Sequence, residues 1–195
     1  MASPNPHELP ADLPVPQDDG AARHLPGMRL PAVSLPATTG GTVRLDTIGN
    51  AVMFCYPRTG RPGMEPPGGE AAWNAIPGAR GCTPQVCGYR DHAAEIRAAG
   101  YEIFGISTQS PADQREAVER LGLSYPLLSD ERLELASALS LPTFEVAGET
   151  LLRRLTVIVR DGRIAAVRYP VFPPDTDAAQ ALSSLPSSGG TPPRG

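Results

Sequence analysis

The feature that most restricts the fold is a short apolar run, Ala51 to Tyr56, that ends at Pro57. No polar residue alternates with the apolar ones, and a run of this length is typical of a strand buried on both faces. Both faces of a strand are buried only where other elements cover the sheet on both sides. We therefore expect this run to be a central strand of a layered α/β domain.

The flanking sequence alternates strand and helix patterns. A hairpin is predicted from Val33–Leu35 and Thr42–Leu45 around Thr39-Gly40-Gly41, and a second from Leu155–Val159 and Ile164–Val167 around Asp161-Gly162. A further strand is expected at Tyr101–Ser107, and helices from Thr83-Pro84 up to Gly100 and at Pro111–Leu121, Glu131–Leu139 and Asp175–Leu182. This order predicts an α/β class with a thioredoxin-like fold, a mixed central sheet flanked by helices.

Length and composition indicate one domain between two unpacked ends. The chain has 195 residues, 41% of them hydrophobic, which supports a single core. Residues 1–26 are rich in Pro and acidic residues and predict a flexible arm, residues 27–182 the domain, and the Ser, Gly and Pro of residues 183–195 a disordered tail.

Charge and hydropathy disfavour two kinds of partner. The net charge is -4, so the chain lacks the basic face that binds nucleic acid. No run approaches the roughly 20 apolar residues that span a bilayer, and residues 1–10 lack the pattern of a signal peptide. We expect no membrane partner and a cytoplasmic location.

Three cysteines do not make a disulfide framework, so each is considered separately. Cys82 stands just before the helix that Thr83-Pro84 opens, where the unpaired N–H groups and the helix dipole favour a thiolate. A peroxide would oxidise such a thiolate to a sulfenic acid, which condenses with a second thiol. Cys87 is the candidate for that thiol.

The spacing of Cys82 and Cys87 requires a local rearrangement before they can bond. On a regular helix, Cα atoms five residues apart are about 8 to 9 Å apart, beyond the roughly 7 Å that a disulfide tolerates. We therefore expect the first helical turn to open during a catalytic cycle, and Gly88 weakens the helix at that place.

The segment from Gly81 to Asp91, GCTPQVCGYRD, resembles the active-site segment of Q-type peroxiredoxins, also called bacterioferritin comigratory proteins. These belong to the alkyl hydroperoxide reductase and thiol-specific antioxidant family. The resemblance extends over roughly residues 28–182, through Phe54–Pro57, Gly105–Thr108, Leu127–Asp130 and Arg154–Ile164.

The resemblance implies a role for each matched residue. It makes Cys82 the peroxidatic cysteine, Cys87 the resolving cysteine, and Arg154 the arginine that stabilises the thiolate and orients the peroxide, with Arg153 as a neighbouring rival. It also implies a hydroperoxide substrate, a thioredoxin-like protein as reductant, and a monomer or homodimer. No metal or organic cofactor is expected.

The chain departs from the family pattern before the cysteine. The family places a proline, three residues, a Thr or Ser, two residues and then the cysteine, whereas Ala79 stands three residues before Cys82. An insertion of about 18 residues, at about residues 60–78, explains the difference. We expect it to fold over the pocket and keep Pro57 beside Cys82, with Thr59 as the candidate for the hydroxyl. Trp73 and Ile76 would narrow peroxide access, although Trp73 could equally pin the insertion down.

Other interpretations of these residues remain open. Cys87 could be a buried structural thiol, and Cys55, inside the apolar run, is best interpreted as a packed hydrophobe. Cys82, Cys87 and His92 lack the paired spacing and fourth ligand of a structural zinc site. The alternative functions are a thiol-disulfide oxidoreductase, disfavoured by the lack of a Cys-x-x-Cys pair, and a non-catalytic thioredoxin-fold binding module.

Overall fold

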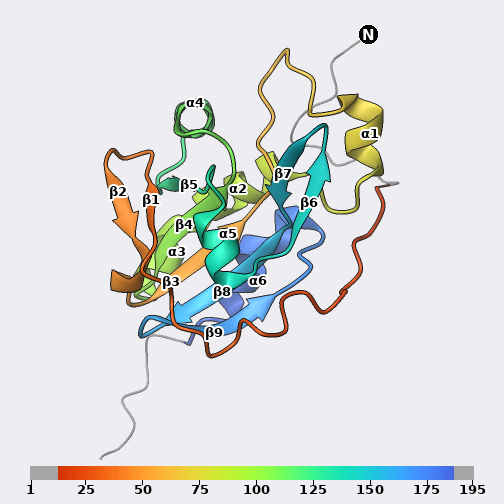
Figure 1. Ribbon diagram of the computed structural model, residues 1–195. Helices are drawn as coiled ribbons and strands as arrows, with labels where there is room; N and C mark the ends of the chain where they lie inside the picture. Colours follow the sequence, from red (N-terminus) through yellow and green to blue (C-terminus); the bar gives the residue numbers. More distant parts are fainter. Residues whose placement is uncertain (1–12, 187–195) are drawn as a thin grey trace, which may run out of the picture.

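The architecture is a central five-stranded mixed sheet, seen in a computed structural model that describes residues 13–186 (Figure 1). The strand order is β5-β4-β3-β8-β9, with β3 parallel to β4, β4 parallel to β5, and β8 antiparallel to both β3 and β9. The strands of this sheet are β3 (Ala51–Cys55), β4 (Glu102–Ser107), β5 (Leu127–Ser129), β8 (Leu155–Arg160) and β9 (Arg163–Arg168). The apolar run is thus the middle strand, and the predicted α/β class with a mixed sheet is confirmed.

Two small hairpins and six α-helices complete the described part of the chain. The hairpins are β1 (Ser34–Pro36) with β2 (Thr42–Arg44), and β6 (Thr143–Val146) with β7 (Glu149–Leu152). The helices are α1 (Gly69–Ala75), α2 (Cys82–Asp91), α3 (Ala93–Ala98), α4 (Pro111–Leu121), α5 (Glu134–Leu139) and α6 (Asp177–Ser183), with short 3-10 turns at Leu45–Thr47 and Pro174–Thr176. No helix in residues 13–186 combines the length and apolar character needed to cross a bilayer.

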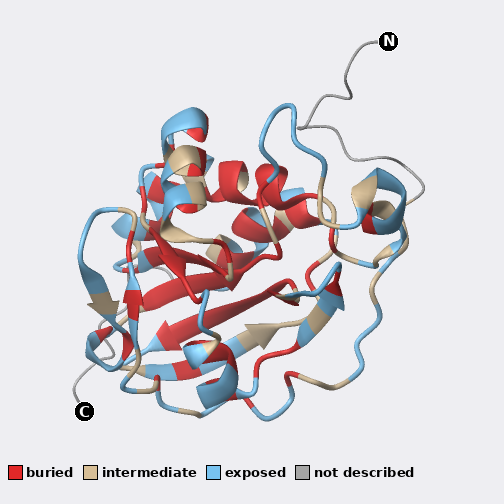
Figure 2. Cartoon of the chain, turned by 45° about the horizontal axis from the view of Figure 1, so that its top comes forward, coloured by how far each residue is buried: buried red, intermediate tan, exposed pale blue. Residues whose placement is uncertain are grey.

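The two faces of the sheet have separate cores because side chains alternate along β3. Val52 and Phe54 point to one face, where the residues of α2, α3, α4 and α6 pack. Met53 and Cys55 point to the other, which α5, the β1–β2 hairpin and the N-terminal segment cover. Figure 2 shows the central strands buried and the outer sides of the helices exposed.

The structure differs from the sequence prediction at the helix that carries both cysteines. The predicted helix began with a Thr83 cap and ran up to Gly100, whereas α2 begins at Cys82 and breaks at His92, and α3 follows. Gly81 has φ 99°, a left-handed conformation that glycine adopts without strain, and it caps the helix two residues earlier than predicted. Cys82 therefore lies inside the first turn of α2.

The predicted N-terminal arm also differs over its described part. Residues 1–12 lie outside the described residues, but Ala22 and Leu25 are buried in the core, and the His24 ring forms a hydrogen bond of 2.8 Å with the Leu139 carbonyl oxygen. Because the segment is rich in proline, its composition did not indicate that Ala22 and Leu25 are core residues. Part of the predicted tail, residues 187–195, lies outside the described residues, whereas Ser183 ends α6 and Leu185 is buried.

One glycine in the sheet is required by close packing. A Cβ at Gly105 in β4 would lie 2.6 Å from Leu127 Cδ2 and 2.8 Å from Phe54 Cζ, closer than real Cβ contacts allow. Phe54 cannot move freely because its ring stacks on Tyr89 with centroids 4.0 Å apart. The Phe54–Tyr89 stack joins the central strand to α2.

We therefore expect Gly105→Ala to lower the free energy of unfolding by about 1–3 kcal/mol, the usual cost of overpacking. Urea denaturation would measure the loss. Gly49→Ala is the matched control, because a Cβ at Gly49 meets nothing within 4 Å and should leave stability nearly unchanged. Equal stability of the two variants would contradict this account of Gly105.

Candidate active site

Cys82 is held at the start of α2 by contacts from two separate segments. Its side chain is buried, and its Sγ accepts a hydrogen bond of 3.3 Å from the Arg58 backbone N–H, just after β3. As a thiol, Cys82 can donate to the Ala79 carbonyl oxygen at 3.5 Å. The structure therefore places the strand end and the helix start around one sulfur, although 24 residues separate Arg58 from Cys82.

Arg154 supplies the positive charge beside this sulfur. Its Nη2 lies 3.2 Å from Cys82 Sγ and also donates to the carbonyl oxygens of Gly78, Ala79 and Arg80 at 3.1–3.3 Å. The side chain is 3% exposed, and no carboxylate within residues 13–186 is in ion-pair range of it. A buried cation without a direct counter-charge favours a negative sulfur next to it.

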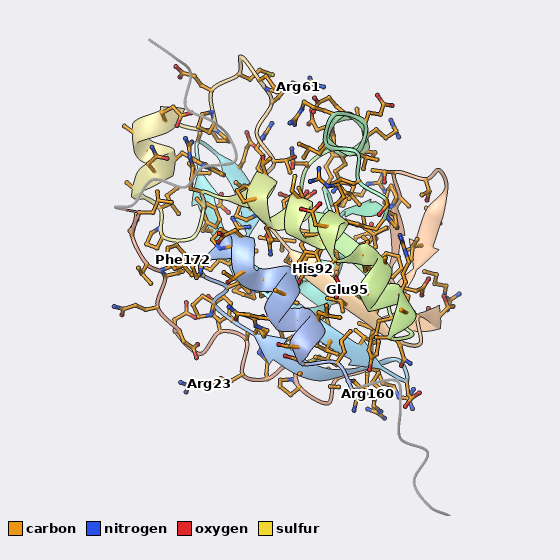
Figure 3. The ribbon with its side chains drawn as sticks, turned by 180° about the vertical axis from the view of Figure 1, so that it is seen from behind. Arg23, Arg61, His92, Glu95, Arg160 and Phe172 are labelled. Atoms are coloured by element: carbon orange, nitrogen blue, oxygen red, sulfur yellow. The ribbon has the colours of Figure 1, made fainter. Side chains whose placement is uncertain are left out.

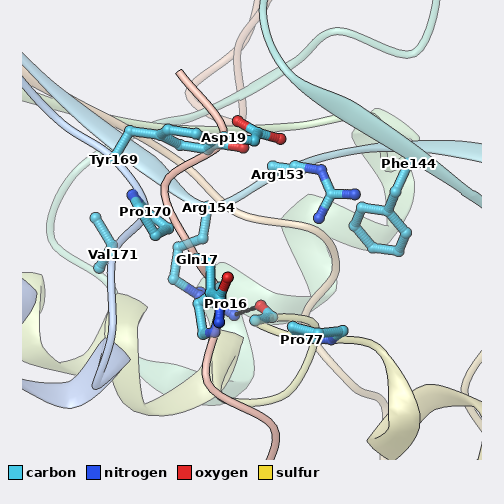
Figure 4. A pocket seen from close by; sticks show the side chains of 11 residues that line it. Pro16, Gln17, Asp19, Pro77, Phe144, Arg153, Arg154, Tyr169, Pro170 and Val171 are labelled. Atoms are coloured by element: carbon cyan, nitrogen blue, oxygen red, sulfur yellow. Dashed lines mark hydrogen bonds between the residues drawn. The ribbon is translucent and has the colours of Figure 1, made fainter. Parts of the chain in front are cut away.

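Arg153, the neighbouring rival, points elsewhere. Its guanidinium carbon lies 5.6 Å from the centre of the Phe144 ring, a cation–π contact on the β6–β7 hairpin. Figure 4 shows the two arginines diverging around a cavity of about 230 Å³, with Asp19 and Tyr169 on one side. Burial, with a contribution from Asp19, raises the pKa of Tyr169 to about 12.

A larger cavity of about 490 Å³ opens onto Cys82. Its walls come from the insertion, the start of α2 and α4, and include Thr59, Trp73, Cys82, Pro84 and Glu116. Ion pairs join Arg80 to Glu70 and Arg120 to Glu116 at 2.7 Å, and Arg120 also donates to the Gly60 carbonyl oxygen at 2.8 Å. Residues of the insertion therefore form part of the wall of the cavity that reaches Cys82.

Trp73 both anchors the insertion and lines this cavity. It is buried, packs in a small cluster with Ala79, Val146 and Leu151, and its ring centre is 6.4 Å from that of Phe144. Ile76 packs against the same cluster. The β6–β7 hairpin, which the sequence analysis did not predict, is thus the surface on which the insertion rests.

Thr59 lies beside the site, and its hydroxyl is engaged with Gln109. The Thr59 N–H and hydroxyl both donate to Gln109 Oε1, at 2.9 and 3.0 Å, and Gln109 Nε2 is 3.3 Å from the Thr59 carbonyl oxygen. This clamp fixes the segment that begins with buried Pro57 and whose Arg58 N–H reaches the sulfur. The structure therefore gives Thr59 a place in holding the loop.

The remaining cysteines have different surroundings. Cys87 lies five residues further along α2 and is 5% exposed, and burial raises the pKa of its thiol above the ordinary value. Cys55 is buried within β3, and burial raises its pKa much further. All three cysteines are free thiols in this structure. Within residues 13–186, no group of His, Cys, Asp and Glu side chains is arranged to hold a metal ion.

A known protein family matches most of the chain. The Redoxin family matches residues 25–183. The chain belongs to the Redoxin family. This family match covers the whole central sheet, α2 with its two cysteines, and Arg154.

Individual relatives place the chain among the peroxiredoxins of the Q type. A candidate peroxiredoxin of Mycobacterium tuberculosis is 30% identical over 155 residues, covering 76% of this chain and 87% of the relative. Peroxiredoxin Bcp of Escherichia coli is 35% identical over 103 residues, covering 52% of this chain and 54% of the relative. The crystal structure of peroxidoxin BcpB from M. tuberculosis has a TM-score of 0.65 at 27% identity, covering 83% of this chain and 97% of that one.

The resemblance inferred from the sequence is thereby confirmed. The chain is a Q-type peroxiredoxin with a thioredoxin-like fold, and it is a thiol-dependent peroxidase. Peroxiredoxin Q of Xanthomonas campestris has a TM-score of 0.63 at 21% identity and agrees in fold.

Sequence reasoning did not find several residues that hold the site together. Gln85 accepts a hydrogen bond from Arg154 Nη1, and Gln109 clamps Thr59. The sequence does contain a signal for Gln85, because it lies about one helical turn after Cys82 and is a polar residue on a helix that packs against the sheet. Gln109 carried no such signal, because its partner is 50 residues away.

We expect Thr59→Val to lower kcat/KM for peroxide about 2- to 10-fold, the effect of losing one hydrogen bond of about 0.5–1.5 kcal/mol. Thr59→Ser is the matched control, because it keeps the hydroxyl that donates to Gln109. Stopped-flow peroxide consumption would compare the two. A Thr59→Val enzyme with unchanged kinetics would remove the hydroxyl from the mechanism.

Proposed function

We propose that this peroxiredoxin reduces hydrogen peroxide or organic hydroperoxides through a sulfenic acid on Cys82. The observation that carries the proposal is the pair of donors, Arg154 Nη2 at 3.2 Å and the Arg58 N–H at 3.3 Å, on a sulfur that faces a cavity at a helix start. Donors arranged in advance around a reacting atom favour the charge that develops there. The similarity to peroxiredoxin Bcp of Escherichia coli supports this chemistry.

In the first step, the Cys82 thiolate attacks the distal oxygen of the hydroperoxide. An S–O bond forms as the O–O bond breaks, the sulfur loses two electrons, and the leaving alkoxide or hydroxide takes up a proton to become an alcohol or water. Arg154 and the Arg58 N–H are placed to orient the peroxide and to stabilise this charge.

In the second step, the Cys87 thiolate attacks the sulfur of the sulfenic acid. The S–O bond breaks, hydroxide leaves as water after protonation, and a Cys82–Cys87 disulfide forms. Both residues lie on α2, so the turn between them must open first. An external dithiol then reduces the disulfide by thiol exchange, and the resemblance to Q-type peroxiredoxins implies a thioredoxin-like protein for this role.

Mass spectrometry after one equivalent of peroxide tests this scheme. We expect a Cys82–Cys87 linkage in the wild-type protein, no peroxide consumption by Cys82→Ser, and a sulfenic acid that dimedone traps in Cys87→Ser. Cys55→Ser is the matched control and should behave as the wild type, because Cys55 lies within the sheet. Normal turnover by Cys82→Ser would refute the proposal.

The disulfide-forming step should depend on pH. Burial raises the pKa of Cys87, so the reactive thiolate is a minor form at neutral pH, and its fraction increases as pH rises. We expect the rate of disulfide formation to rise about tenfold per pH unit below that pKa. Rapid acid quench and mass spectrometry would follow both steps, and a flat profile for the second step between about pH 6 and pH 8 would contradict the expectation.

A further inference from the structure

Asp177 is a buried carboxylate on which several polar groups of the domain converge. It is the first residue of α6 and is fully buried. Its Oδ2 accepts hydrogen bonds from Gln85 Nε2 at 2.8 Å, from the Tyr89 hydroxyl at 2.9 Å and from the Thr156 hydroxyl at 2.7 Å. The donors come from α2 and β8, and Figure 3 shows α6 lying alongside α2.

The carboxylate determines which way the Gln85 amide points. A carboxylate can only accept hydrogen bonds, so the NH2 group of Gln85 has to face Asp177. The carbonyl oxygen of the same amide then faces Arg154 Nη1, which donates to it. The reversed amide would set two donors, the Gln85 NH2 and the arginine, against each other.

A second arginine keeps Asp177 in this accepting role. Arg168 Nη1 lies 3.6 Å from Asp177 Oδ1 and donates to the Asp177 backbone carbonyl oxygen at 3.3 Å. The positive charge compensates the buried carboxylate. The contacts therefore form one continuous chain from Arg168 through Asp177, Gln85 and Arg154 to the sulfur of Cys82.

We propose that Asp177 is a positioning residue for the peroxide reaction: it orients the Gln85 amide, which holds the Arg154 guanidinium against Cys82. This inference rests on the proposed function of Cys82 and Arg154. Asp177 itself does not touch the substrate. A role limited to docking α6 would need only the Tyr89 and Thr156 hydrogen bonds and would not depend on the polarity of Gln85.

A charge exchange between two residues separates these roles. In Asp177→Asn, the new amide can satisfy Gln85 only by turning its NH2 toward Arg168, so either orientation leaves two donors opposed. In Gln85→Glu alone, two carboxylates face each other. In the double variant Asp177→Asn/Gln85→Glu, the introduced amide donates to the introduced carboxylate, which in turn accepts from Arg154. The total charge of the double variant is that of the wild type.

Three quantities are measured for each variant: the pH profile of Cys82 alkylation by iodoacetamide, kcat/KM for peroxide, and the melting temperature. The alkylation profile of the Cys82→Ser protein is subtracted to remove the contribution of the other cysteines. We expect each single variant to shift the alkylation midpoint to higher pH and to lower kcat/KM about tenfold or more, as misplacement of a reacting group does. The double variant should return kcat/KM to within about threefold of the wild type, a coupling that a double-mutant cycle quantifies. Its alkylation midpoint should stay above that of the wild type, because the carboxylate introduced at residue 85 offsets the charge of Arg154.

Asp130→Asn is the matched control. Asp130 is also a buried carboxylate at a helix start, where it accepts the backbone N–H groups of Leu135 and Ala136, but it serves α5 on the other face of the sheet. Its loss should lower the melting temperature and leave the alkylation profile unchanged.

Two results would overturn the inference. One is a folded Asp177→Asn protein with the wild-type alkylation profile, and the other is a double variant that is no better than either single variant. Failure of the proposed function would differ from both, since the wild-type protein itself would then alkylate at Cys82 but consume no peroxide.

Discussion

The contact of the Arg154 guanidinium with Cys82 is the interaction on which the rest of the site depends. A buried arginine without a carboxylate of its own is costly, and here its hydrogens are distributed over three carbonyl groups, one amide and one sulfur. The three carbonyls belong to Gly78, at the end of the insertion, and to Ala79 and Arg80, which follow it. The same side chain therefore closes the inserted segment and places a positive charge beside the thiol.

This arrangement explains how the end of β3 and Cys82 stay close together although the insertion separates them in the sequence. The insertion carries its own helix, α1, and attaches through Trp73 to the β6–β7 hairpin, so the residues that follow it return to Arg154. At its other end, Gln109 holds Thr59 and thereby the Arg58 N–H. Two separate sets of hydrogen bonds thus bring the strand end and the helix start together around the sulfur.

The elements predicted correctly from the sequence are those that local patterns determine. The β3 run, the β8–β9 hairpin with its Asp161-Gly162 turn, and α4 with Pro111 at its start all depend on neighbouring residues. The insertion helix and the β6–β7 hairpin were missed because their stability comes from packing on each other, through Trp73 and Phe144. Likewise, Asp177 is 92 residues from Gln85, and no local sequence pattern near either residue predicts their contact. The N-terminal arm was misjudged because Leu25 gains its burial from a distant part of the core.

The placement of Gln85 on the first turns of α2 has a consequence for the oxidised protein. In the proposed mechanism, a disulfide between Cys82 and Cys87 spans Gln85, so the rearrangement that joins the two sulfurs also displaces the amide that connects Arg154 with Asp177. Under this proposal, oxidation disrupts the geometry that binds peroxide at the same time as it consumes the nucleophile. Reduction restores the geometry and the nucleophile together. The first turns of α2 are then either fully ready for the next turnover or not ready at all.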